Sequence, residues 1–154
     1  MDERDEARDV TDMQELKANL SPDAFHIYAG HYYKCKQDFK PPDHYPSPVP
    51  FFLLCRAIEL EIKARHLKRL TQSGVKKRFR HHLLKAYKAL DVQEQILSQN
   101  ELAVLRTVDK LYTRTDFAYF RQEHTLTAFS QFPDLDMLDT IAKKLIDSGS
   151  TTWE

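Results

Sequence analysis

The chain has 154 residues, of which 42% are apolar and 30% charged, and its 23 basic side chains balance its 23 acidic ones. This composition favours one soluble globular domain and excludes collagen, a disulfide scaffold and wholesale disorder. The longest apolar run, Val49 to Cys55, is far shorter than the roughly 18 residues that indicate a membrane-spanning helix, so no membrane partner is expected. The acidic start and two cysteines without a CxxC motif predict a cytoplasmic protein.

The balanced charge is unevenly distributed along the chain. Residues 1–15 hold seven acids and two arginines, whereas residues 56–88 hold two acids and eleven bases together with three histidines. Clustered lysines and arginines attract phosphate groups and release counterions when nucleic acid binds. The alternative is an ordinary solvated helical face whose field the acidic segments cancel.

Residues 1–15 are highly charged and have few groups to bury, so a mobile N-terminus is expected. Ser21, Pro22 and Asp23 are typical of a helix start, and the apolar spacing that follows predicts a helix ending near Phe39. Five prolines between residues 40 and 50 then interrupt helical structure. A long second helix is predicted over residues 49–71.

Gly74 is expected to separate the second helix from a third, which starts at Lys76 or His81 and ends at Leu90. A serine at 98 and a glutamate at 101 have capping-box spacing and predict a fourth helix ending near Thr113. The aromatic residues between 112 and 132 have no clear period and indicate a loop packed over the bundle. A last helix is predicted from Pro133 to Gly149.

Every strong apolar pattern in the chain has a helical period, and three glycines provide little turn material for a sheet. The predicted fold class is therefore all-α, a bundle of about five helices with an aromatic-rich loop before the last helix. The predicted organisation is a mobile N-terminus at 1–15, a single helical domain at 16–148 and a tail at 149–154.

A polar stripe crosses the second helix between two apolar flanks. Arg56, Glu59, Lys63 and His66 share one face, because each residue turns the helix by about 100 degrees. A second polar sector, which consists of Glu61, Arg65, Lys68 and Arg69, is expected to be the solvent face. The stripe is therefore more polar than solubility requires, and we interpret it as a partly enclosed cluster. The alternative is a surface ion pair between Glu59 and Lys63.

Three segments of the sequence carry a resemblance to a known family. The run from Phe52 to Ala64 resembles a "FLxxxAIELxLKA" segment, and Lys77 to Leu83 resembles a "KKFGHDL" element. Residues 117–120 and 132–134 are similar to a late aromatic segment before a closing helix. Over residues 21–147 the chain resembles the HEPN-like bacterial helical domain family. The match carries over Glu59, Lys63 and His81, with Arg80 in place of the family's glycine.

The resemblance implies a HEPN-like helical bundle in a class that often forms homodimers. This class includes RNA-cleaving toxins, defence proteins and nucleotide-binding modules. The expected function is binding of RNA, a nucleotide or a protein partner, such as an antitoxin or another operon-encoded protein, in a toxin-antitoxin or defence system. The alternatives are a divergent metal-independent endoribonuclease toxin and a purely structural dimerisation module. Because no arginine is followed by histidine at the nuclease spacing, RNA cleavage is expected to be absent or weak.

Whether the chain is an enzyme stays open at this point. Candidate catalytic residues are His81, Lys63 and Glu59, because imidazole transfers protons near neutral pH and lysine stabilises phosphate charge. The residues expected to bind a ligand are Arg56, Glu59, Lys63, His66, Lys77, Arg78, Arg80, His81 and His82. No metal site and no cofactor are expected, since histidine and glycine spacings match no known motif. Cys35 is expected to lie in the core, and the two apolar flanks of the second helix favour a homodimer.

Overall fold

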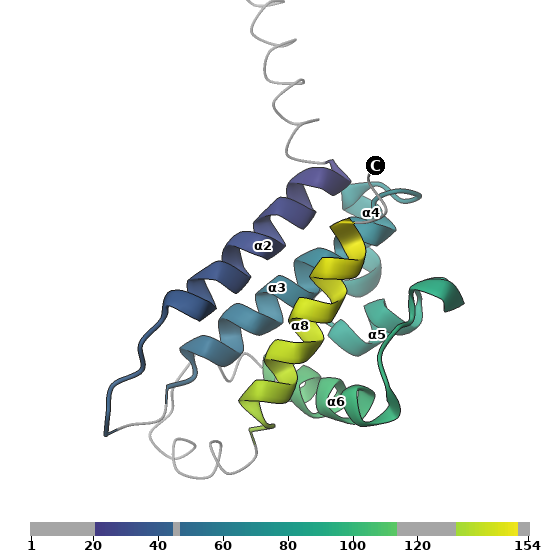
Figure 1. Cartoon of the computed structure of the whole chain (residues 1–154). Helices are drawn as coiled ribbons and strands as arrows, with labels where there is room; N and C mark the ends of the chain where they lie inside the picture. Colours follow the sequence, from purple (N-terminus) through teal and green to yellow (C-terminus); the bar gives the residue numbers. More distant parts are fainter. Residues whose placement is uncertain (1–20, 45–46, 114–131, 151–154) are drawn as a thin grey trace, which may run out of the picture.

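The computed structural model describes residues 21–44, 47–113 and 132–150 (Figure 1). The expected mobile N-terminus at 1–15 lies outside these residues, as does most of the expected aromatic-rich loop. The described residues form six α-helices and one 3₁₀ helix and contain no strand, which confirms the all-α fold class. The elements are α2 (Pro22–Asp38), α3 (Val49–His66), α4 (Gln72–Phe79), α5 (Leu83–Lys88), η1 (Val92–Glu94), α6 (Gln99–Thr113) and α8 (Leu135–Ser150).

Helix α3 is the central element, with α2 and α8 packed along it and α5 and α6 against the rest of its surface (Figure 1). Twelve of its 18 residues are buried, and Leu54, Ile58 and Ile62 form the middle of the core. Both apolar flanks of this helix are covered within one chain. These flanks therefore give no support to the predicted homodimer, which stays a prediction based on the family resemblance.

Local hydrogen bonds explain where two of the helices begin. Ser21 Oγ accepts a hydrogen bond from the Ala24 N–H at 3.1 Å, as expected of a serine N-cap. Ser98 and Glu101 form the predicted capping box, in which each side chain accepts from the other residue's backbone N–H, at 3.2 and 2.8 Å. These two helix starts were predictable because each signal depends on residues within one helical turn.

The predicted third helix is in fact two short helices. Thr71 caps α4 by accepting a hydrogen bond from the Gly74 N–H at 3.1 Å, so Gly74 lies inside a helix instead of separating two. The chain then turns sharply at Arg80 before α5 begins. The second helix ends at His66, earlier than the predicted Thr71.

The predicted solvent face of α3 is partly wrong. Glu61 is 0% exposed and Arg65 is 6% exposed, because α2 and α8 cover this side of the helix. Arg65 Nη2 donates to the Leu145 carbonyl at 2.7 Å and to Ser148 Oγ at 2.5 Å, both on α8. Glu61 Oε2 lies 2.7 Å from Nδ1 of His26 on α2. A buried polar network thus connects three helices where the sequence pattern predicted a solvent-exposed face.

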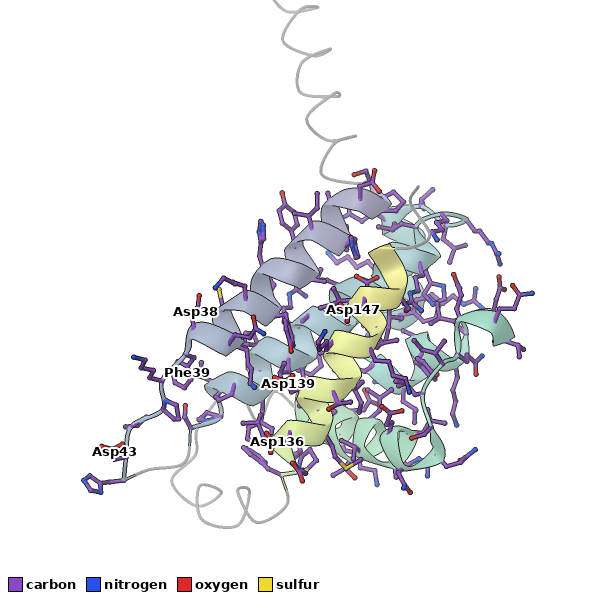
Figure 2. The ribbon with its side chains drawn as sticks, in the orientation of Figure 1. Asp38, Phe39, Asp43, Asp136, Asp139 and Asp147 are labelled. Carbon is purple, nitrogen blue, oxygen red and sulfur yellow. The ribbon has the colours of Figure 1, made fainter. Side chains whose placement is uncertain are left out.

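A second polar contact joins α2 to α8 directly. Asp139 lies on α8 near α2, at the position labelled in Figure 2, and its Oδ1 accepts from the Tyr33 hydroxyl at 2.7 Å. Lys36 forms an ion pair with the same carboxylate. Burial and this aspartate raise the pKa of Tyr33 to about 12. Cys35, on the same helix, was predicted to lie in the core, but it is exposed. It lies on the side of α2 that faces away from α3 and α8.

Gly149 lies within the last turn of α8, whereas the sequence pattern predicted that it would end the helix and begin a tail. A Cβ at this position would lie closer to Glu61 Oε1 than van der Waals contact allows, and 3.1 Å from His26 Nδ1. Its φ angle is not positive, so glycine is required here by close approach and not by backbone conformation.

Replacing Gly149 with alanine is expected to lower the free energy of unfolding by about 2 kcal/mol, because the buried Glu61 side chain must move away from His26. Gly30→Ala on α2 is the matched control, since a Cβ there meets no atom within 4 Å. That variant is expected to gain up to about 1 kcal/mol from helix propensity. Urea denaturation of both variants measures the difference, and a Gly149→Ala protein as stable as Gly30→Ala would contradict the predicted clash.

Candidate functional site

The centre of the candidate site is the carboxylate of Glu59, which is only 2% exposed. Its Oε1 accepts a hydrogen bond from Lys63 Nζ at 2.7 Å and lies 2.9 Å from His81 Nδ1 and 3.2 Å from Arg56 Nη1. Its Oε2 accepts a hydrogen bond from the hydroxyl of Tyr112. Lys63 and His81 therefore contact the same oxygen of Glu59, and each of the two carboxylate oxygens has at least one partner.

Burial alone would raise the pKa of Glu59, but its partners outweigh that effect. The positive charge and hydrogen bond of Lys63, the Tyr112 hydroxyl and Arg56 together lower the pKa below its usual value. Burial and the neighbouring Glu59 charge raise the pKa of Tyr112, so this phenol stays protonated and acts as a donor. The carboxylate is consequently ionised at neutral pH and compensated by donors from two other segments of the chain.

Tyr112 was not among the predicted site residues. It lies in the last turn of α6 and is 8% exposed, and the sequence analysis grouped it with the aromatic residues of a loop packed over the bundle. Only the fold brings its hydroxyl to Glu59, 53 residues away in the chain. One sequence signal could have identified Tyr112 as a site residue. It is a tyrosine among the aliphatic positions of α6, and a buried hydroxyl requires a polar partner.

A tight turn places His81 beside Glu59. The His82 N–H donates to the Phe79 carbonyl at 2.8 Å, and Arg80 between them has φ 47° and ψ −115°. These angles are close to those of the first central residue of a type II′ turn, which is usually glycine. Lys63 Nζ donates to the Arg80 carbonyl at 2.5 Å and so fastens the turn to α3. Arg80 therefore occupies a position that favours glycine, which is the residue at this position in the family that the sequence resembles.

Helix α6 holds the far side of the same turn. His82, the residue that precedes α5, makes no side-chain capping bond, and Asp109 on α6 supplies the acceptor instead. Its Oδ1 accepts from the Leu83 N–H at 2.7 Å. Burial raises the pKa of Asp109 despite this hydrogen bond. The turn is thus anchored to α3 by Lys63 and to α6 by Asp109, which holds His81 in place.

An open pocket of about 950 Å³ lies beside this cluster, between the end of α3, α4 and the start of α2. Helices α2 and α4 meet at the same end of the molecule (Figure 1). The only carboxylate among the lining residues is Glu59, and five of the lining side chains are cationic. The ionisable lining residues are Arg56, Glu59, Lys63, Lys76, Lys77, Arg80 and His81. Of these, Lys76 was missed, because its position in α4 depended on a helix start that the sequence left undecided.

Three predicted ligand-binding residues do not line this pocket. His66 is buried and stacks on Phe79 with ring centroids 4.4 Å apart, and its Nε2 lies 2.8 Å from the Ala86 carbonyl oxygen. Burial lowers the pKa of His66. Arg78 and His66 line a smaller cavity of about 190 Å³ across α4, whereas the exposed His82 lines neither. The polar stripe of α3 therefore ends at Lys63, one turn before His66.

No family model, curated protein or solved structure matches the chain. None of the helices in the described ranges is long and apolar enough to cross a membrane. The same ranges contain no group of three or more histidine, cysteine or acidic side chains placed to hold a metal ion.

Replacing Glu59 with glutamine is expected to lower the free energy of unfolding at pH 7 by about 2 kcal/mol, because Lys63 and Arg56 lose their counter-charge. The folded-state pKa of Glu59 is lowered, so its stabilisation is complete above the unfolded pKa and disappears as the pH falls through the folded one. The difference between wild type and Glu59→Gln should therefore shrink between about pH 5 and pH 3. Urea denaturation across this range measures it.

Glu61→Gln is the matched control on the same helix. Burial raises the pKa of Glu61 more than its partners lower it, so the folded state favours the protonated form. Lowering the pH should therefore stabilise wild type relative to Glu61→Gln, the opposite trend to Glu59→Gln. If the free energies of unfolding of the two variants, each relative to wild type, changed with pH in the same direction, the opposite pKa shifts assigned to Glu59 and Glu61 would be contradicted.

Replacing Arg80 with glycine is expected to raise the free energy of unfolding by about 1 kcal/mol, because the positive φ strains a residue that has a Cβ. Arg78→Gly is the control, since residue 78 lies within α4, where glycine should cost about 1 kcal/mol. Thermal or urea unfolding measures both. Equal destabilisation by the two glycines would show that the turn is not strained.

Proposed function

We propose that the chain is a HEPN-like domain that binds RNA through the phosphate groups of its strand. The observation that carries this proposal is the pocket beside Glu59, in which five cationic side chains surround a single carboxylate. Cationic donors converging on an open surface are the usual means of holding a phosphate backbone. The acidic segments elsewhere in the chain contribute no other lining carboxylate among the described residues.

The cations of the pocket fall into two groups. Arg56 and Lys63 share the charge of Glu59, so together they leave an excess of positive charge at the base of the pocket. Lys76, Lys77 and Arg80 are exposed, and none of them forms an ion pair with another described residue. These three side chains are available to an incoming anion without breaking an existing contact.

The arrangement suits a strand with several phosphates better than a single anion. The available cations extend from α4 into the turn after it, while Arg56 and Lys63 lie on α3. They belong to different elements and surround an open pocket instead of a closed cage. A repeating polyanion can contact several of them at once, and each contact releases counterions.

The test is fluorescence anisotropy with a labelled single-stranded 12-nucleotide RNA between 50 and 200 mM salt. If about four phosphates are bound, the affinity should fall about 50-fold over this range, because each contact with a single strand contributes about −0.7 to the logarithmic salt slope. Affinity that does not depend on salt would contradict the proposal.

Replacing Lys76 and Lys77 with alanine and Arg80 with glycine is expected to weaken binding and flatten the salt slope by about 2, since three phosphate contacts are lost. The control removes three exposed lysines that do not line the pocket, Lys85, Lys88 and Lys110. This control variant has the same net charge as the pocket variant. It should keep most of the wild-type RNA affinity and salt slope. Equal losses in both triple variants would assign the binding to overall charge instead of the pocket.

Gel electrophoresis of the same RNA separates the proposal from its rivals. A shifted band with full-length RNA supports binding without cleavage. Shortened products that disappear in His81→Ala would overturn this proposal in favour of the endoribonuclease. Neither a shift nor a product would favour the structural dimerisation module.

A further inference from the structure

We propose that His81 accepts a hydrogen bond from the ribose 2′-hydroxyl next to a bound phosphate, so that the pocket distinguishes RNA from DNA. This inference rests on the proposed function, because it concerns how the same pocket reads the sugar of the strand. It adds one specificity-determining residue to a set of contacts that would otherwise hold any phosphate backbone.

The carboxylate of Glu59 determines which nitrogen of His81 carries the hydrogen. Glu59 is ionised and can only accept hydrogen bonds, and its Oε1 lies 2.9 Å from His81 Nδ1. Nδ1 must therefore carry the hydrogen of the neutral ring, which leaves a lone pair on Nε2. A carboxylate that orients a histidine in this way converts the other ring nitrogen into an acceptor of fixed direction.

Nε2 is free to meet a ligand. The side chain of His81 is 65% exposed and lines the pocket. The only polar contact of the ring with another described residue is made by Nδ1. The ring makes a T-shaped contact with that of Tyr112, with centroids 6.1 Å apart and planes at 82°, which restricts its rotation. The acceptor is therefore exposed on a ring that two neighbours hold in place.

His81 is unusual among the polar groups of this pocket because it can accept. Arginine and lysine side chains only donate. The oxygens of Glu59 are already occupied by Lys63, Arg56, His81 and Tyr112. The remaining lining residues with acceptors, Gln72 and Ser73, lie in the exposed first turn of α4 and make no contact that fixes them.

The chemistry that fits this arrangement is a hydroxyl donor beside a phosphate. Lys63 and His81 contact the same oxygen of Glu59, at 2.7 and 2.9 Å, so a cation and an acceptor lie next to each other at the pocket wall. In RNA each 2′-hydroxyl is adjacent to a backbone phosphate, and DNA lacks this donor. A site that hydrogen-bonds a hydroxyl discriminates strongly against the analogue without it.

The experiment compares three 12-nucleotide strands of one sequence at pH 8. One strand is RNA, one carries 2′-fluoro groups and one is DNA. The 2′-fluoro strand keeps an RNA-like sugar conformation but has no 2′ donor, so it separates hydrogen bonding from backbone shape. Wild type is expected to bind RNA about tenfold more tightly than either of the other strands.

His81→Phe keeps an aromatic ring and removes both nitrogens. It is expected to bind RNA as weakly as wild type binds the 2′-fluoro strand, with its DNA affinity and salt slope unchanged. His81→Gln, which offers an amide oxygen near the Nε2 position, should recover part of the preference. His82→Phe is the matched control at an exposed neighbour outside the pocket, and it should keep the full preference.

Equal affinity of wild type for RNA and the 2′-fluoro strand would overturn this inference while leaving the proposed function intact, provided that binding depends on salt. A preference for RNA that survives in His81→Phe would also overturn it, because another group would then read the sugar. Failure of all three strands to bind would instead contradict the proposed function itself.

Discussion

The burial of one carboxylate organises this end of the bundle. Glu59 lies on the central helix at a position closed to solvent, and a buried charge without compensation would destabilise the fold. Compensation comes from Arg56 and Lys63 on the same helix, from His81 in the turn after α4 and from Tyr112 on α6. The contacts that neutralise the charge therefore also assemble the pocket wall.

The two glutamates of α3 show how the same side chain serves different purposes on opposite sides of one helix. Glu59 faces an opening, and each of its oxygens has a donor. Glu61 faces the closed interface with α2 and α8, where one oxygen meets His26 and the other has no hydrogen-bond partner in the described structure. Gly149 allows α8 to approach this second carboxylate closely. The first glutamate orders a site, whereas the second lies where α8 approaches α3 closely.

Much of the fold was predictable because its signals are local. The serine caps, the capping box and the helical apolar spacing depend on residues within a few positions of one another. The polar stripe was also predictable up to Lys63, since α3 continues through it. The burial of Glu61 and Arg65 was not, because helix periodicity cannot show how many neighbours surround a helix. Tyr112 joins the site through a contact between residues far apart in the chain, and the turn at Arg80 uses a backbone conformation that arginine rarely adopts.

The geometry of the site requires that Glu59 holds the hydrogen of neutral His81 on Nδ1 and leaves Nε2 as an acceptor in the pocket. Nitrogen-15 NMR of the histidine rings in the intact chain measures this directly, since protonated and unprotonated ring nitrogens have well-separated chemical shifts. Neutral His81 is expected to carry its hydrogen on Nδ1 in wild type and to lose this preference in Glu59→Gln. A neutral His81 with its hydrogen mainly on Nε2 in the wild-type chain would contradict this role of Glu59.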